Sequence, residues 1–148
     1  MKILVKKLHP DAKIPYKTHG NDFCYDCVAV SCEKLADNVY KYGLGLSFEI
    51  IREDGQKEII TDIEARARSS VWKTGMVLSN CVKGTIDEPY RGEVAAIFYH
   101  VLPDMPKYEV GDRVVQICLG KTEKIEFEEV DELSETQRGT GGFGSTGK

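Results

Sequence analysis

The densest group of residues that could do chemistry lies in the segment Gly84–Val94, GTIDEPYRGEV. Its glycines and proline predict a hairpin bend, and the bend carries Asp87 and Tyr90. A carboxylate in such a bend could act as a general base on water or bind a sugar hydroxyl. Charged turn residues are often merely solvated, but a large ring in a turn needs a core to enter or a flat ligand to lie against. The segment therefore favours a site for a sugar or a base.

Two other segments combine donors that suit phosphate oxygens. Arg66–Ser70, RARSS, follows a predicted strand and places guanidinium and hydroxyl groups at close spacing. Gly111–Gln116, GDRVVQ, is predicted to be a turn that enters a strand, where the Gln116 amide needs a partner if it is buried. Asp112 and Arg113 are expected to pair with each other or with neighbours. Each segment alone is a weak indication of phosphate binding.

The segment around Cys24 and Cys27 offers both acidic and sulfur ligands. Asp22 and Asp26 flank it, and one of them could lie near the water shell of magnesium, which takes few protein ligands. The C-x-x-C spacing could indicate zinc, but no second Cys or His pair follows it, and residues three apart on an extended segment point to opposite faces. Buried structural thiols are the favoured interpretation. An odd total of five cysteines without a secretion signal argues against a disulfide framework.

The C-terminal segment Arg138–Lys148, RGTGGFGSTGK, differs in kind from the rest of the chain. It carries five glycines in eleven residues and one aromatic. Such a segment cannot bury enough surface to offset its ordering entropy, so it could be a frayed tail or a linker. Freed backbone N–H groups beside hydroxyls, a cation and an aromatic also describe a phosphate-and-base clamp that orders on binding. By chemistry alone the two interpretations have equal weight.

The elements that must position these residues are predicted to be short strands. Asp54–Gly55, between the apolar runs of Phe48–Ile60, predicts a further hairpin. Ser31–Tyr40 predicts either one short helix or a charged loop. Regularly spaced strands separated by turns predict an all-β antiparallel sandwich or jelly roll. The predicted strands are Ile3–Lys6, Tyr25–Val30, Leu44–Ile51, Glu58–Glu64, Met76–Leu78, Val94–Val101 and Arg113–Leu119.

Length and charge narrow the class of function. The 148 residues, 41% apolar and 30% charged, suit one globular domain, which we place at 1–137, followed by a glycine-rich lid at 138–148. The net charge of −4 provides no basic field for nucleic acid, and no apolar run is long enough for a membrane span. We therefore expect a cytoplasmic protein, or one of the host cytoplasm if it is viral. A polyanionic ligand would be held by a few placed cations or by a metal.

Taken in order, five segments resemble the motifs of the trimeric deoxyuridine triphosphatase family. They span most of the chain, and the third and fifth are the specific ones. Cys24, Ala67 and Ser70 depart from the family pattern, which has glycine, proline and glycine at those positions. The five segments are CYDCVA, ARSSV, GTIDEPYRGEV with Asn80 upstream, GDRVVQ and RGTGGFGSTG.

The resemblance implies a fold, an assembly and a reaction. The fold would be a distorted jelly-roll or β-clip type barrel with a flexible C-terminal arm, assembled as a homotrimer with active sites at subunit junctions. The reaction would be hydrolysis of dUTP to dUMP and pyrophosphate, in which Asp87 activates the water that attacks the α-phosphorus. Mg²⁺ would bridge the phosphates mainly through water, with Asp26 in its outer shell.

The resemblance also assigns the substrate contacts. Tyr90 would lie against the deoxyribose, and the tail would close over the bound nucleotide with Phe143 stacked on uracil. The complete set of implied substrate-binding residues is Arg68, Ser69, Ser70, Asn80, Gly84, Ile86, Tyr90, Gln116, Arg138, Phe143, Gly144, Ser145 and Thr146.

Two alternatives remain at this point. A dCTP deaminase, or a bifunctional deaminase and triphosphatase, shares the fold; RARSS resembles its Arg-Ser-Ser run, and Glu88 or Glu93 could serve as its acid/base. Tyr90 and the complete C-terminal motif argue against it. A nucleotide-gated regulator that binds another protein is the alternative of another class. Intact Asp87, Tyr90 and Arg138 favour retained catalysis.

Overall fold

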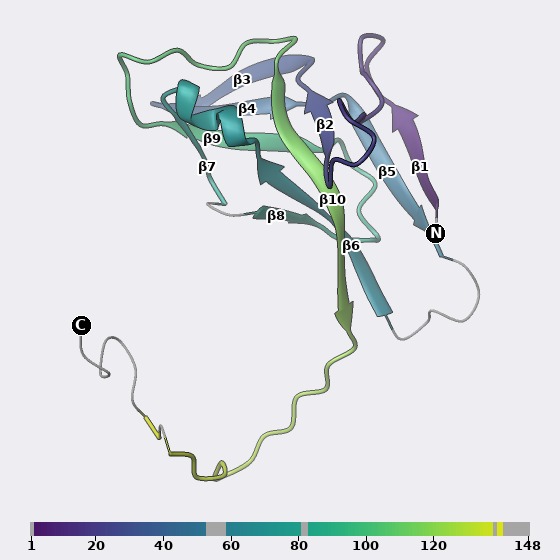
Figure 1. Cartoon of the computed structure of the whole chain (residues 1–148), viewed down its shortest axis with the longest axis vertical. Helices are drawn as coiled ribbons and strands as arrows, with labels where there is room; N and C mark the ends of the chain where they lie inside the picture. The colour runs from purple at the N-terminus through teal and green to yellow at the C-terminus, as the bar shows by residue number, and fades with distance from the viewer. Residues whose placement is uncertain (1, 53–58, 81–82, 138, 141–148) are drawn as a thin grey trace.

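The computed structural model describes residues 2–52, 59–80, 83–137 and 139–140, and nearly all of their regular secondary structure is β-strand (Figure 1). One 3₁₀ helix, η1 (Ser69–Lys73), is the exception within that part of the chain. Within these described residues, no helix is long and apolar enough to cross a bilayer. The strands are β1 (Lys2–Lys7), β2 (Tyr25–Val28), β3 (Ser31–Ala36), β4 (Val39–Gly43), β5 (Leu46–Ile51), β6 (Ile59–Ala67), β7 (Met76–Leu78), β8 (Lys83–Ile86), β9 (Ala95–His100) and β10 (Arg113–Glu123).

The strands form three antiparallel sheets around one core. Two four-stranded sheets, ordered β2-β10-β6-β8 and β3-β4-β9-β7, are accompanied by the pair β1-β5. Among the strands of the described residues, only β3 and β4 are both consecutive in the chain and paired in a sheet, so most connections cross from one sheet to another. This arrangement agrees with the predicted all-β jelly roll.

An aromatic cluster fixes the loop before β10 to one of the sheets. Tyr42 of β4 and Phe98 of β9 are fully buried, and their rings meet edge to face with each other and with Tyr108, at centroid distances between 5.3 Å and 6.2 Å. The buried Tyr42 hydroxyl donates to the Tyr108 carbonyl at 2.7 Å, which satisfies its polar group. The loop before β10 is thereby fixed to the β3-β4-β9-β7 sheet.

The prediction of a short helix or a charged loop over Ser31–Tyr40 was wrong. The segment is a hairpin of β3 and β4, with Ser31 opposite Gly43 and Lys34 opposite Tyr40. Asn38 has φ 60°, a left-handed conformation that asparagine tolerates better than most residues, and it allows the tight reversal. Every residue of β3 is exposed, so this edge strand lacks the apolar alternation by which a strand is recognised in sequence.

Neither predicted hairpin is a ladder of two neighbouring strands. Asp54–Gly55 lies outside the described residues, and the strands on either side of it, β5 and β6, pair with different partners in different sheets. The Gly84–Val94 bend similarly joins β8 to β9, which belong to different sheets. In both places the chain passes from a strand of one sheet to a strand of another.

Residues after β10 leave the barrel. In Figure 1 the chain over 124–137 runs away from all three sheets, and Phe127 and Leu133 on it are 95% and 86% exposed. The barrel formed by the described residues therefore ends with β10 at Glu123. The predicted division into a domain at 1–137 and a lid at 138–148 stays a prediction.

Candidate functional site

The Asp87 bend lines an open hollow at the junction of two sheets. The backbone N–H of Tyr90 donates to the Asp87 carbonyl at 3.0 Å, which closes the turn. Asp87 and Tyr90 are exposed there, and with Ile86 they line a hollow of about 430 Å³ whose wall includes Ala95 and Ile97 of β9. A carboxylate and a ring therefore face the same space, as the sequence predicts.

Gly92, two residues after Tyr90, leaves the space that the Tyr90 ring occupies. A Cβ on Gly92 would overlap the Tyr90 hydroxyl oxygen, so any side chain there would displace the ring. The same hydroxyl donates to the Glu93 carbonyl at 3.0 Å. These contacts present the ring of Tyr90, which is 48% exposed, to the hollow.

Asn80 and Gly84 line a smaller adjoining hollow of about 110 Å³. Its wall also includes Ala95 and Ile97, which places it beside the Asp87 hollow. A Cβ on Gly84 would lie 2.8 Å from Asn80 Nδ2, so a side chain there would displace the Asn80 amide. The structure thus brings Asn80, Gly84, Ile86, Asp87 and Tyr90 together on one surface.

A second hollow, of about 470 Å³, contains the predicted phosphate-binding residues Arg68 and Gln116 together with Asp26. Arg68 Nε donates to Asp26 Oδ1 at 2.7 Å, and Arg68 Nη1 donates to Ser70 Oγ at 3.0 Å. The Gln116 amide donates to the Ala67 carbonyl at 3.0 Å, which supplies the partner that its partial burial requires. Ser69 is exposed at the start of η1 beside them.

The sequence leaves open whether Arg113 pairs with Asp112 or with other neighbours, and the structure shows the second. Arg113 does not pair with Asp112; its Nη1 donates to Asp26 Oδ2 at 3.0 Å and to Thr18 Oγ1 at 3.0 Å. The Asp112 carboxylate instead accepts from the Glu109 N–H at 2.8 Å. No local pattern links Arg113 to Asp26; only the pairing of β10 with β2 brings them together.

Asp26 is consequently not a free carboxylate. Its side chain is 13% exposed, and both oxygens accept from guanidinium groups of Arg68 and Arg113. Within the described residues, no three His, Cys, Asp or Glu side chains are grouped so that they could bind a metal. The donor set does not form a metal site of protein ligands alone, and it leaves room only for the water-mediated contact that the sequence predicts.

Arg66, the other arginine of the RARSS segment, is committed to Glu64. The Glu64 carboxylate is 7% exposed and accepts from Arg66 Nε at 3.1 Å and from Lys83 Nζ. These two hydrogen-bonded cations, Lys83 foremost, hold the pKa of Glu64 down at about 2. Arg66 and Arg68 thus pair with different carboxylates, although they are only two residues apart in the sequence.

The depressed pKa of Glu64 predicts that the folded protein loses stability in acid. A carboxylate whose pKa is lowered by folding contributes stability fully above its ordinary value of about 4.5, and this stability is lost as pH falls toward about 2. The free energy of unfolding of Glu64→Gln should therefore depend less on pH between about 4.5 and 2 than that of the parent protein. Urea unfolding at a series of pH values measures this, with the exposed Glu132→Gln as control. Parallel pH profiles for Glu64→Gln and the parent would contradict the assignment.

The two hollows lie far apart within one chain. Across the sheet β2-β10-β6-β8, Asp26 is opposite Gln116, Gln116 opposite Arg66, and Arg66 opposite Lys83. Asp87 lies four residues after Lys83 in the chain, one residue beyond the end of β8 at Ile86. With strands about 4.8 Å apart and a rise of about 3.3 Å per residue, the Asp26 and Asp87 backbones are separated by roughly 20 Å. One chain does not bring its predicted base to its predicted phosphate-binding residues.

Five predicted substrate-binding residues cannot be placed. They lie outside the described residues, and they are Arg138, Phe143, Gly144, Ser145 and Thr146.

The Glu93 and Glu88 side chains, considered above as a deaminase acid/base, both have structural partners. Glu93 contributes to the wall of the Asp87 hollow, but its Oε1 accepts from the Gly45 N–H at 2.8 Å. Glu88 is paired with Arg52. These partners occupy both carboxylates and so argue against a role for either as the proton carrier of a deaminase.

The chain is similar along its whole length to proteins of known family. The family model described as dUTPase matches residues 65–147. A protein of Helicobacter pylori (strain P12) named deoxyuridine 5'-triphosphate nucleotidohydrolase is 38% identical over 151 aligned residues, which cover 99% of this chain and 97% of that protein. These similarities favour the triphosphatase over the deaminase and over the non-catalytic regulator.

Solved structures show the same fold at lower identity. The dUTPase of Staphylococcus bacteriophage 80alpha with dUpNHpp superimposes with a TM-score of 0.74 at 21% identity, covering 99% of each chain. A mutant dUTPase from phage phi11 of S. aureus, described as coordinating a structural Mg(II) ion, gives 0.67 at 17% identity and covers 91% of this chain and 100% of that one. The predicted jelly roll is thereby confirmed.

Proposed function

The chain belongs to the dUTPase family and hydrolyses dUTP to dUMP and pyrophosphate, and we propose that it does so at a composite site between subunits of a homotrimer. In this site the Asp87 bend of one subunit meets the Asp26–Arg68 hollow of another. The observation that carries the proposal is the separation of roughly 20 Å between these two groups in one chain. A closed ring of three copies would supply three such junctions.

The exposed segment after β10 supports assembly. Ile125, Phe127, Val130 and Leu133 are 63%, 95%, 51% and 86% exposed on a stretch that its own barrel does not cover. Burial of a side chain of this kind contributes about 1.5–3 kcal/mol, so a neighbouring subunit would gain by covering them. The segment also leads directly into the glycine-rich motif. The arm would thus reach a site on another subunit.

Asp87 would act as the general base. Its carboxylate takes a proton from water while the water oxygen bonds to the α-phosphorus, and the bond from that phosphorus to the bridging oxygen breaks. Pyrophosphate leaves with the bridging oxygen, and dUMP carries the new hydroxyl. The exposed position of Asp87 beside Tyr90 also suits a hydrogen bond to the deoxyribose 3'-hydroxyl.

Arg68, Ser69, Ser70 and Gln116 would hold the phosphates at the other side of the junction. Asp26 orients the Arg68 guanidinium before the nucleotide arrives. The ion pair fixes Nε of Arg68, and Nη1 donates a hydrogen bond to Ser70 Oγ. The magnesium that we propose as cofactor would enter with the nucleotide and neutralise phosphate charge. Asp26 would meet its outer water shell, since the carboxylate oxygens are already engaged by arginines.

The base and sugar would be selected by shape. The small hollow beside Asn80, Gly84 and Ile86 leaves little room for a methyl group on the pyrimidine, and Asn80 supplies a polar edge. Phe143 of the tail would stack on the base, and the other predicted tail residues would hold the terminal phosphate: Arg138, Gly144, Ser145 and Thr146.

Tyr90→Ala should weaken rejection of the ribonucleotide. The proposed site places the ring where a 2'-hydroxyl would project, and a filled space discriminates by repulsion rather than by lost attraction. We expect the ratio of kcat/KM for dUTP over UTP to fall about tenfold. Steady-state pyrophosphate release with both substrates measures it, and Tyr99→Ala, at another exposed tyrosine, is the control. An unchanged ratio would contradict this role of Tyr90.

The substrate assignment is tested with purified protein, magnesium and each deoxynucleoside triphosphate in turn. We expect pyrophosphate from dUTP and no ammonia from dCTP. Ammonia release from dCTP would instead support the deaminase.

The composite site is tested by mixing two inactive variants. In a trimer made of Asp87→Asn alone or of Arg68→Ala alone, all the active sites should be inactive. Trimers reassembled from an equal mixture should regain roughly a quarter of the parent activity, because that fraction of junctions combines the two intact halves. The mass in solution should be three times the 16.6 kDa of the chain. No recovery in mixed trimers would place the site within one subunit.

A further inference from the structure

We propose that Cys24, immediately before β2, and Cys118 of the neighbouring strand β10 are a modification site, a pair of thiols that close reversibly to a disulfide. The register of β2 with β10 carries the proposal. Asp26 is opposite Gln116 and Tyr25 opposite Ile117, and extending this register by one residue past the start of β2 places Cys24 opposite Cys118. Directly opposed residues of an antiparallel pair have Cα atoms about 4.5–5.5 Å apart, within the span of about 4.4–6.8 Å that a disulfide bridges.

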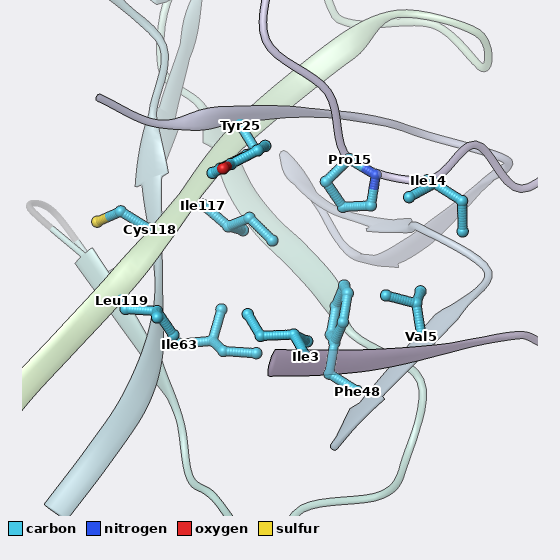
Figure 2. Close-up of a pocket in the computed structure, with 10 residues that line it drawn as sticks. All are labelled: Ile3, Val5, Ile14, Pro15, Tyr25, Phe48, Ile63, Ile117, Cys118 and Leu119. Carbon is cyan, nitrogen blue, oxygen red and sulfur yellow. The ribbon is translucent and has the colours of Figure 1, made fainter. Parts of the chain in front are cut away.

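The side chains agree with the backbone register. Gln116 and Cys118 lie on the same face of β10, and Figure 2 shows the Cys118 sulfur turned away from the apolar residues that line the interior of the barrel, among them Ile117 and Leu119. Cys24 also lies close enough to Cys118 to contribute to the raised pKa of the Cys118 thiol. The two sulfur atoms therefore share one face of the sheet.

The two thiols have different access to solvent. Cys24 is half-buried and lines the hollow of Asp26 and Arg68, where a small oxidant can reach it. Cys118 is 7% exposed, and its S–H donates to Glu64 Oε2 at 3.7 Å. Burial, together with Cys24, raises the pKa of Cys118 to about 11. Cys24 is therefore the thiol that reacts first.

The chemistry balances with a low-molecular-weight disulfide such as glutathione disulfide. The Cys24 sulfur attacks one sulfur of the oxidant, forming a mixed disulfide and releasing one thiol. The Cys118 sulfur, after loss of its proton to solvent, attacks the Cys24 sulfur, and the second thiol leaves with a proton. Two protein thiols are oxidised and one small disulfide is reduced to two thiols.

The other described cysteines lack such a partner geometry. Cys27 points to the opposite face from Cys24, is fully buried, and burial raises its pKa to about 12. Cys32 is exposed, but it lies on β3 in a different sheet from β10. The C-x-x-C spacing in the sequence is thus not the reactive pair; the pair is made by strand register.

The experiment maps cysteine linkage in the full chain. Reduced protein is incubated with glutathione disulfide, remaining thiols are alkylated, and tryptic peptides are analysed by mass spectrometry. Cys24 lies in the peptide 18–34, with Cys27 and Cys32, and Cys118 lies in 114–121. We expect these two peptides to be joined, with fragment ions that locate the bond at Cys24, and separated again by dithiothreitol.

Variants sharpen the outcome. Cys24→Ser and Cys118→Ser should each abolish the joined peptide, whereas Cys27→Ser and Cys32→Ser should preserve it. The fragment ions of the parent protein decide the question even if a variant fails to fold. Alkylation of both Cys24 and Cys118 after prolonged oxidation would overturn the proposal. Linkage of Cys24 to Cys27, Cys32 or Cys81 would overturn it equally.

Discussion

Asp87→Asn is expected to lower kcat for dUTP about a thousandfold while the affinity for a non-hydrolysable dUTP analogue changes by less than about threefold. An amide cannot take a proton from water, and loss of a general base typically costs between about a hundredfold and ten-thousandfold. The amide keeps the shape and the hydrogen-bonding reach of the carboxylate. The bend keeps its turn as well, because the Asp87 carbonyl, not the side chain, closes it.

The measurement pairs pyrophosphate release with calorimetric binding of the analogue. Asp104→Asn, which changes another exposed turn aspartate away from the bend, is the matched control and should leave kcat unchanged. Turnover within about threefold of the parent in Asp87→Asn would remove Asp87 as the base. Equal losses of turnover and affinity would instead make it a binding residue.

Ending the chain at Gln137 is expected to lower kcat/KM about a hundredfold without unfolding the protein. The buried core of the described residues lies in and before β10, so the deletion removes none of it. What is lost is the segment with Arg138, Phe143, Gly144, Ser145 and Thr146, which we expect to exclude water and position the phosphates.

Thermal unfolding and the mass in solution check the first half of this expectation, and steady-state kinetics the second. Ending the chain at Thr146 removes only Gly147 and Lys148 and serves as the control. A truncated protein that aggregates would show that the tail is structural. A truncated protein with full activity would show that the barrel alone makes the site.

The strands with strong apolar patterns could be predicted from sequence, and the weak ones could not. Val94–Val101 corresponds to β9, whose buried residues recur on one side, and Arg113–Leu119 corresponds to β10, an apolar run that is buried on both faces. β3 is exposed throughout and β8 is only four residues long, so neither carries such a pattern. Both were missed for the same reason, since an edge strand is specified by its neighbour's hydrogen bonds rather than by its own side chains.

Half of the candidate site could be found as a local motif. Asp87, Tyr90 and Gly92 lie within one short bend, so their spacing reflects their geometry directly. The partnership of Asp26 with Arg113 joins positions 87 residues apart and depends on the register of β2 and β10. The same register pairs Cys24 with Cys118 instead of Cys27. Sequence spacing cannot indicate contacts of this range, because a shift of one residue would reverse which face each side chain occupies.

The ion pairs of Asp26 affect how strongly the hollow binds different anions. The two guanidinium groups and the carboxylate between them carry one net positive charge instead of two, so sulfate, inorganic phosphate or a nucleoside monophosphate gains less by approaching them than it would from two unpaired arginines. A triphosphate that carries its own divalent counterion can engage the remaining N–H groups without separating the pair. The hollow therefore binds small anions more weakly than two unpaired arginines would. This favours release of the monophosphate product and limits competition by the simple anions of the cell.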